Sequence, residues 1–122
     1  MAVNTTPTTT TPATTTPAAG GEDKKKADIQ LALSTTLKAA RENDKLVFCG
    51  GLSIGYQTKT WGGAIECQAA AAKGDIPSQF KKASDASSST TINGNRATVI
   101  TVDGNTFQFV KGPSFWTIDG LG

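Results

Sequence analysis

The last third of the chain alternates between apolar and polar residues, which is the pattern of strands with one buried face. Asn93-Gly94 and Asp103-Gly104 are typical two-residue hairpin turns of type I′, and Lys111-Gly112 is a weaker turn signal. The segments after these turns are rich in Thr, Val, Ile, Phe and Trp, which favour strands. We therefore predict an antiparallel meander with strands at 96–102, 105–110 and 114–118.

The turns also predict the register of this meander. A two-residue loop at Asp103-Gly104 would place Ile100 opposite Phe107, and a similar loop at Lys111-Gly112 would place Trp116 opposite Phe107. The apolar face would then consist of Ile100, Val102, Phe107, Phe109, Trp116 and Ile118. The opposite face would carry Thr101, Thr106, Gln108 and Thr117, a charge-poor surface that suits either solvent or a neighbouring subunit.

Residues 28–43 contain neither Gly nor Pro, and their apolar residues recur at helical spacing. This stripe, which predicts an amphipathic helix, consists of Ile29, Leu33, Leu37 and Ala40. Asp28 or Asp23 is expected to cap the helix N-terminus. Leu31 lies off the stripe, which suggests that the helix is covered on more than one side.

The middle of the chain mixes a short apolar run, a glycine-rich stretch and an alanine-rich stretch. Residues 45–49 are predicted to form a short buried strand, and the alternation of Leu52, Ile54 and Tyr56 predicts a bent or bulged strand. Residues 64–73 predict a helix that stops at Gly74, and a helical turn near Ile76-Pro77 is expected to carry Phe80. Packing the helices on the apolar face of the meander gives one α+β domain, residues 22–122.

Residues 1–21, which we call the arm, are low in complexity and contain no charged side chain. Pro7, Pro12 and Pro17 recur every five residues in a Thr/Ala background, which favours polyproline II and disfavours helix. One interpretation is a disordered tether. The other is an extended arm that docks on a neighbouring subunit through Thr5, Pro7, Pro12 and Pro17, with Gly20-Gly21 as its hinge.

Cys49 and Cys67 are the only cysteines, so they either form a disulfide or remain two buried thiols. A disulfide would close a loop of about 19 residues and add roughly 3 kcal/mol of stability. The N-terminus lacks the basic region and apolar run of a secretory signal. We therefore expect free thiols, with the disulfide as the alternative.

The composition excludes much chemistry. Histidine is absent, so Ser-His-Asp and Cys-His catalysis are impossible, and two cysteines alone cannot complete a zinc site. Twelve basic against ten acidic residues give a net charge of +2, too small for strong attraction to nucleic acid. No stretch approaches the roughly 20 apolar residues of a membrane span. We expect no catalytic residue, cofactor, metal, specific nucleic acid or membrane span.

These features favour a non-enzymatic structural protein of a larger assembly, most simply a decoration or cement subunit of a virus particle, with other protein subunits as partners and an oligomeric state. The alternative is an extracellular binding or adhesion module on a Thr/Pro tether, in which Trp61 in its glycine loop anchors a partner or a sugar ring. Trp61 is otherwise a lid on the small core. A small enzyme or inhibitor that depends on a thiol or an acidic pair is the third hypothesis.

Overall fold

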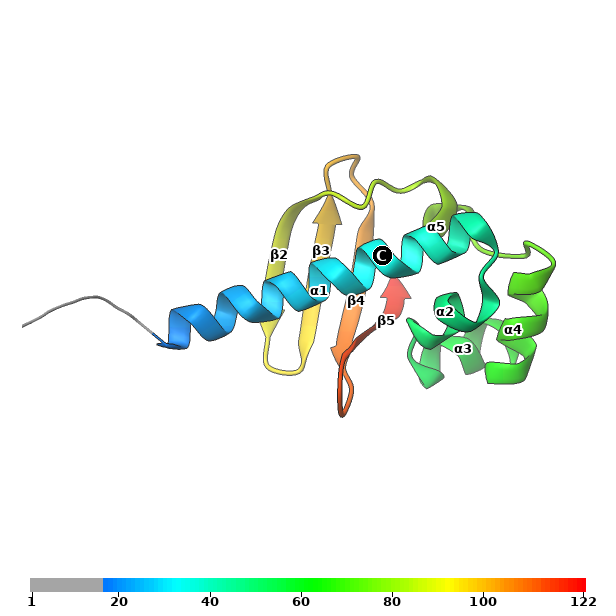
Figure 1. The fold of residues 1–122 in the computed structure, drawn as a ribbon, viewed down its shortest axis with the longest axis horizontal. Helices are drawn as coiled ribbons and strands as arrows, with labels where there is room; N and C mark the ends of the chain where they lie inside the picture. The colour runs from blue at the N-terminus through cyan, green and yellow to red at the C-terminus, as the bar shows by residue number, and fades with distance from the viewer. Residues whose placement is uncertain (1–16) are drawn as a thin grey trace, which may run out of the picture.

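The computed structural model describes the backbone of residues 17–122 and the side chains of residues 23–122. Five helices precede a four-stranded sheet in this part of the chain (Figure 1). The helices are α1 (Pro17–Glu42), α2 (Lys45–Gly50), α3 (Ile54–Trp61), α4 (Ala64–Ala72) and α5 (Ser78–Lys82). The strands are β2 (Ser87–Asn93), β3 (Arg96–Thr101), β4 (Thr106–Lys111) and β5 (Trp116–Leu121). The predicted α+β class with a C-terminal antiparallel meander is confirmed.

Helix α1 confirms the predicted stripe but begins eleven residues before the predicted start. Ile29, Leu33, Leu37 and Ala40 are all fully buried against the core. Gly20 and Gly21 lie inside α1, so the predicted hinge is wrong. Pro17 stands at the first helical position, where its missing N–H and fixed φ favour helix initiation. Asp28 is not a cap, because it lies within the helix and pairs with Lys24.

The two strands predicted between 45 and 56 are wrong, since both segments are helical. Asp44 caps α2 by accepting from the Val47 N–H at 3.4 Å, and Ser53 caps α3 by accepting from the Tyr56 N–H at 3.0 Å. Only Leu52, between these helices, makes a single parallel bridge to Ile118. The predicted helix at 64–73 is confirmed as α4, and the predicted turn as α5, which buries Phe80 completely.

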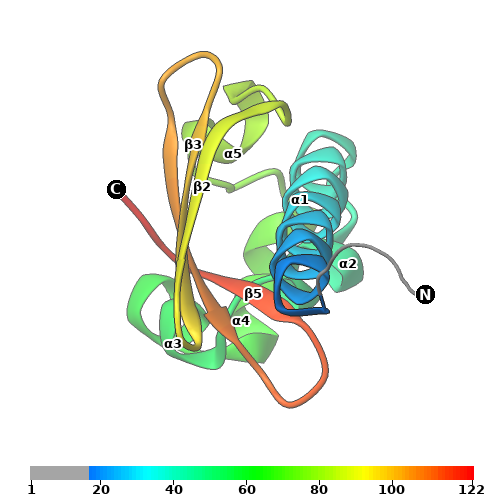
Figure 2. The same cartoon turned by 90° about the vertical axis from the view of Figure 1, so that its left-hand side faces the viewer.

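The strands follow one another in the order β2-β3-β4-β5, and α1 packs across one face of the sheet (Figure 2). Strand β2 is an additional strand for which no prediction was made, because its sequence Ser-Ser-Ser-Thr-Thr-Ile-Asn lacks a clear apolar face. It pairs with β3 through the turn that follows Asn93, and Asn93 is opposite Arg96.

The predicted register between β3 and β4 is wrong by one residue. Val99, not Ile100, lies opposite Phe107. The loop has three residues, because the Thr101 N–H donates to the Asn105 carbonyl at 2.8 Å and Gly104 takes a left-handed φ of 88° between them. One extra loop residue turns every side chain of β3 over. Hence Val99 and Thr101 are buried, whereas Ile100 and Val102 are exposed.

The β4–β5 register also differs from the prediction. Trp116 lies opposite Lys111 rather than Phe107, because residues 112–115 form a four-residue loop. Its ends are held by the Gly112 N–H, which donates to the Phe115 carbonyl at 2.8 Å. Phe107, Phe109, Trp116 and Ile118 nevertheless share the buried face, as predicted. On the outer face Thr106, Gln108 and Thr117 are half-buried, whereas the predicted outer residue Thr101 points inward.

The core joins the helical half to the sheet through aromatic rings and one disulfide. Phe80 packs edge-on against Phe48 at 5.1 Å between ring centroids and lies 5.9 Å from Phe107 of β4. Cys49 and Cys67 form a disulfide that joins α2 to α4, with their Cα atoms 6.2 Å apart. The expectation of two free thiols is therefore wrong, and the alternative holds.

Candidate functional site

An open groove of about 790 Å³ lies between α1, α2 and the β4–β5 loop. We call it the α1 groove. Three partly exposed apolar side chains form its walls: Leu31 of α1, Val47 of α2 and Phe115 of the loop, which are 67%, 42% and 58% exposed. Its volume lies within the range of small-molecule sites, about 300–1,000 Å³.

The walls arise from how α1 divides its apolar residues. The stripe that begins at Ile29 faces the core, whereas Leu31 lies two positions later and points away from it. Val47 is left outside when α2 buries Phe48 and Cys49. Phe115 is held at the end of the 112–115 loop, directly before the buried Trp116. Each element thus leaves one apolar side chain on the groove.

The inner part of the groove contains Thr36, Gly51 and Trp116. A Cβ at Gly51 would lie 2.1 Å from Thr36 Oγ1, so only glycine permits α2 to approach α1 this closely. Trp116 is 2% exposed, and its Nε1 has no hydrogen-bond partner among the described residues. An unpaired buried donor costs about 1–3 kcal/mol.

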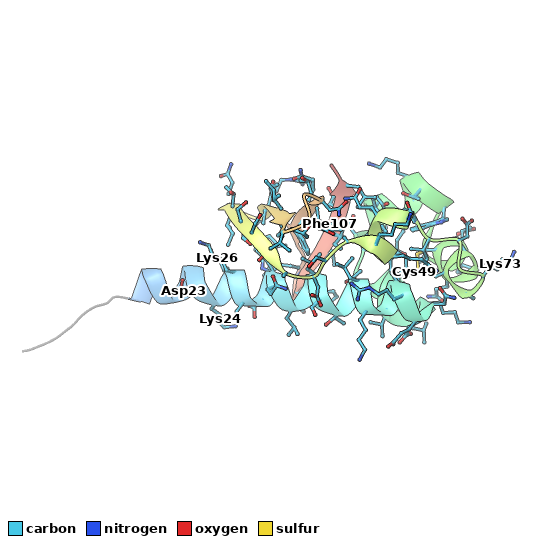
Figure 3. All side chains as sticks on the ribbon, turned by 90° about the horizontal axis from the view of Figure 1, so that it is seen from above. Asp23, Lys24, Lys26, Cys49, Lys73 and Phe107 are labelled. Carbon is cyan, nitrogen blue, oxygen red and sulfur yellow. A yellow bond between two sulfur atoms is a disulfide. The ribbon has the colours of Figure 1, made fainter. Side chains whose placement is uncertain are left out.

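Lysines and one aspartate lie at the rim. Lys24 Nζ is 3.3 Å from Asp28 Oδ2, and the two side chains are 76% and 49% exposed, so the pair contributes little stability. Lys25 and Lys111 complete the rim, and Lys111 Nζ donates to the Gly112 carbonyl at 3.4 Å. Lys24 and Lys26 extend from opposite sides of α1, and only Lys24 of these two borders the groove (Figure 3).

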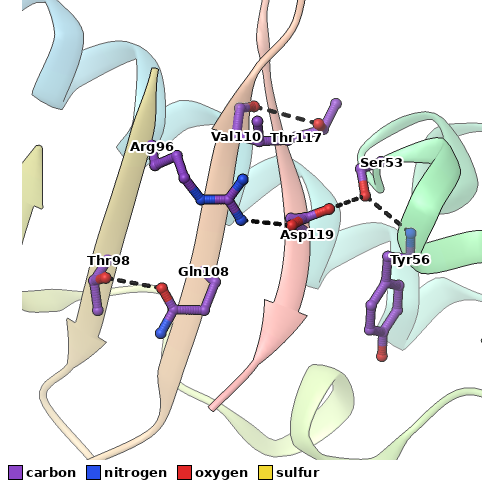
Figure 4. A network of polar contacts seen from close by, with 8 residues as sticks. All are labelled: Ser53, Tyr56, Arg96, Thr98, Gln108, Val110, Thr117 and Asp119. Carbon is purple, nitrogen blue, oxygen red and sulfur yellow. Dashed lines mark hydrogen bonds and ion pairs between the residues drawn. The ribbon is translucent and has the colours of Figure 1, made fainter. Parts of the chain in front are cut away.

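A second polar cluster lies on the other side of β5 and serves the fold. Asp119 Oδ1 accepts from Ser53 Oγ at 2.6 Å, and its Oδ2 pairs with Arg96 Nη2 at 2.6 Å (Figure 4). The Ser53 hydroxyl and then the Arg96 guanidinium hold the pKa of the Asp119 carboxyl below its usual value. Since Ser53 Oγ also accepts from the Tyr56 N–H, the hydroxyl is committed to capping α3 and linking it to β5.

In the Asp119 cluster the Ser53 hydroxyl donates to the carboxylate, and its oxygen also accepts from the Tyr56 N–H at the start of α3. Among the described residues, no three His, Cys, Asp or Glu side chains gather as a metal site would require. Within that same part of the chain, no helix has the length and apolar character needed to span a bilayer. The α1 groove thus combines an apolar lining with charged side chains at its rim.

The predicted contact residues fall in three places. Thr5, Pro7 and Pro12 lie outside the described residues, and Pro17 is the first residue of α1. Trp61 ends α3, where it is half-buried and packs edge-on against Phe48 and Tyr56 at 6.0 and 5.9 Å. This geometry is that of a lid on the core, and a role of Trp61 in binding stays a prediction.

Sequence reasoning did not identify Val47, Phe115 or the Trp116 indole as parts of a site. One signal was present, because Leu31 stood off the helical stripe. Phe115 carried no such signal, since an aromatic residue next to a tryptophan suggests a strand with two covered faces. In comparisons with known proteins, no family model, no curated protein and no solved structure matches this chain.

Proposed function

We propose that the chain is a non-enzymatic structural subunit of a larger assembly, of the kind that decorates or cements a virus particle, and that it contacts its neighbours through the N-terminal part of the arm. The observation that carries this proposal is the α1 groove. It is open and apolar, and Leu31, Val47 and Phe115 are only partly covered. Exposed apolar side chains gathered in one recess are typical of surfaces that bind another protein.

Two further observations support the proposal. The polar cluster around Asp119 has a structural use, because it links the cap of α3 to β5 and pairs with β3. The disulfide between Cys49 and Cys67 is the kind of cross-link that persists outside the reducing cytosol, as in proteins on virion surfaces. A small domain that is stabilised in this way suits an exposed position on a particle.

Size fractionation of material from source cells tests this function. The full chain should sediment with large particles, whereas a variant lacking residues 2–16 should remain in the light fractions. A variant in which residues 2–16 are replaced by Gly/Ser of equal length separates the effect of sequence from that of length, and it should also remain light. Sedimentation of the full chain as a free monomer in source material would contradict the proposal.

The disulfide also favours a second candidate, an extracellular binding or adhesion module with Trp61 as its anchor. Because Trp61 packs on Phe48 and Tyr56, Trp61→Ala risks a loss of stability, and Trp61→Phe is the matched variant that keeps an aromatic ring there. Quenching of tryptophan fluorescence by glycans, weakened in Trp61→Phe, would support this candidate. Unchanged tryptophan fluorescence over a glycan panel would contradict this second candidate.

A further inference from the structure

The α1 groove is shaped for an extended segment. Its edge on α1 runs from Lys24 to Thr36, a rise of about 18 Å at 1.5 Å per residue. The opposite side is formed by α2 and the β4–β5 loop, whose positions next to α1 can be followed in Figure 2. An extended polyproline II segment rises about 3.1 Å per residue, so about six residues would fill this length.

Residues 1–16 have the composition of such a segment. They precede Pro17, contain Pro7 and Pro12 in a Thr-rich background and carry no charged side chain. Aromatic-lined grooves bind polyproline II segments because this helix is preformed and loses little conformational entropy on binding. The α1 groove provides the Phe115 ring on its wall for such a contact.

We propose that the α1 groove binds residues 1–16 of a second copy of this chain as an extended segment, with Thr and Pro side chains packed on the exposed Leu31, Val47 and Phe115 side chains. This inference rests on the proposed function, because it assigns the docking surface for the N-terminal part of the arm. Each copy then carries both halves of the contact, the groove and the segment that fills the groove of a neighbour.

Two of the three lysines at the rim already have partners, so the rim offers an acidic occupant fewer free charges than three lysines would. Lys24 is paired with Asp28 at 3.3 Å, and Lys111 donates to the Gly112 carbonyl at 3.4 Å. These two lysines therefore already have partners, and their apolar stems remain available for contact with Thr and Pro side chains. An acidic peptide would have to compete with Asp28 for Lys24.

A second copy is favoured over the same chain by the way the segment joins α1. The groove begins at Lys24, which is seven residues, or about 10 Å of helix, beyond Pro17. To reach its own groove, the segment would have to reverse its direction just before Pro17. The residue before a proline is held in an extended conformation, which opposes such a reversal. A segment from a second copy needs no reversal.

Sedimentation equilibrium of the purified full chain, from micromolar to millimolar concentration, tests the proposal. The chain should associate, and Phe115→Ala should raise the dissociation constant about tenfold or more, as loss of an anchor residue does. Ile65→Ala is the matched control, because Ile65 is 80% exposed on α4 and does not border the groove. The double variant Pro7→Ala/Pro12→Ala changes the bound segment instead of the groove, and it should also weaken association. Circular dichroism checks that each variant is folded.

Mixing ¹³C-labelled with unlabelled full chain identifies the occupant. The ring signals of Phe115 should shift with concentration while the indole signals of Trp61 stay in place. The Phe115 ring should also show nuclear Overhauser contacts to proline ring protons of the unlabelled copy. Contacts only within one copy would overturn the proposal in favour of self-docking, and association that Phe115→Ala leaves unchanged would also overturn it.

The two proposals fail in different ways. If the full chain enters large particles in source cells but stays monomeric when pure, the assembly function stands and the second copy is wrong as the occupant. If deletion of residues 2–16 changes neither behaviour, both proposals fall.

Discussion

Removing the Cys49–Cys67 disulfide should destabilise the domain by about 3 kcal/mol. The two cysteines are 18 residues apart in sequence, and the chain-entropy relation for a loop of that size gives about 11 cal/mol/K, or about 3 kcal/mol at 25 °C. Both residues are almost fully buried, so Cys49→Ala/Cys67→Ala also removes packing and should cost a total of roughly 3–5 kcal/mol. For a domain of this size, 3 kcal/mol lowers Tm by roughly 12–24 °C.

Urea unfolding, followed by circular dichroism with and without dithiothreitol, measures this difference. Reduction keeps both sulfur atoms, so it isolates the cross-link from the packing. The reduced chain should also show a larger m-value, since its unfolded state is less restricted and exposes more surface. The alanine pair is the control, because dithiothreitol should leave its unfolding curve in place. Equal midpoints for the oxidised and reduced chain would refute the loop-closure reasoning.

Three further outcomes are expected. Phe80→Ala should cost about 3–5 kcal/mol in urea unfolding, because Phe80 is fully buried at the junction of helices and sheet, and a cost below about 1 kcal/mol would contradict that placement. Gly51→Ala should destabilise by about 1–3 kcal/mol through its clash with Thr36 Oγ1, and Thr36→Ala in the same chain should recover part of the loss in a double-mutant cycle. The pKa of Asp119 is lower in the folded state than its unfolded value near 4, so the ionised carboxylate stabilises the fold above that unfolded pKa. This stabilisation is lost as the pH falls through the lower folded pKa. Asp119→Asn should therefore make the free energy of unfolding fall less steeply with acid below about pH 4, as measured by urea unfolding across pH. An unchanged pH dependence would show that Asp119 does not contribute to this loss of stability.

The long-period patterns were sufficient to predict the architecture. Four apolar residues of α1 at helical spacing are all buried, and the alternating residues of β4 and β5 face the core. These predictions hold because each depends on many residues, so that one irregular position cannot reverse them. The early start of α1 could not be predicted from such a stripe, since residues 17–27 carry none.

Short segments were predicted less well, for two physical reasons. An apolar run of five residues, such as 45–49, fits a buried strand or a helical turn equally well. The capping residues Asp44 and Ser53 are the stronger signal, because each precedes a segment that is helical in the structure. The β3–β4 register depended on a single loop residue. Asp103-Gly104 forms part of a three-residue loop in which Gly104 alone supplies the left-handed conformation, and this shifts Ile100 to the surface.

The α1 groove was beyond sequence reasoning because it is made of residues far apart in the chain. Leu31, Val47 and Phe115 meet only after α2 turns back along α1 and the β4–β5 loop closes beside them. The Trp116 indole is likewise recognisable as an unpaired donor only in the fold, since the sequence does not show which acceptors surround it. Only Leu31 stood out beforehand, as an apolar residue off the helical stripe.

The disulfide and the groove share α2, so the stability prediction also bears on the docking surface. Val47 forms a wall of the groove two residues before Cys49, and Gly51 follows two residues after it. Six-residue α2 is too short to be stable by itself, and it depends on α1, α4 and the disulfide to hold its position. If the groove binds a neighbouring copy, reduction should weaken association even below the temperature at which the domain unfolds. Association that resists reduction would mean that packing against α1 alone holds Val47 and Gly51 in place.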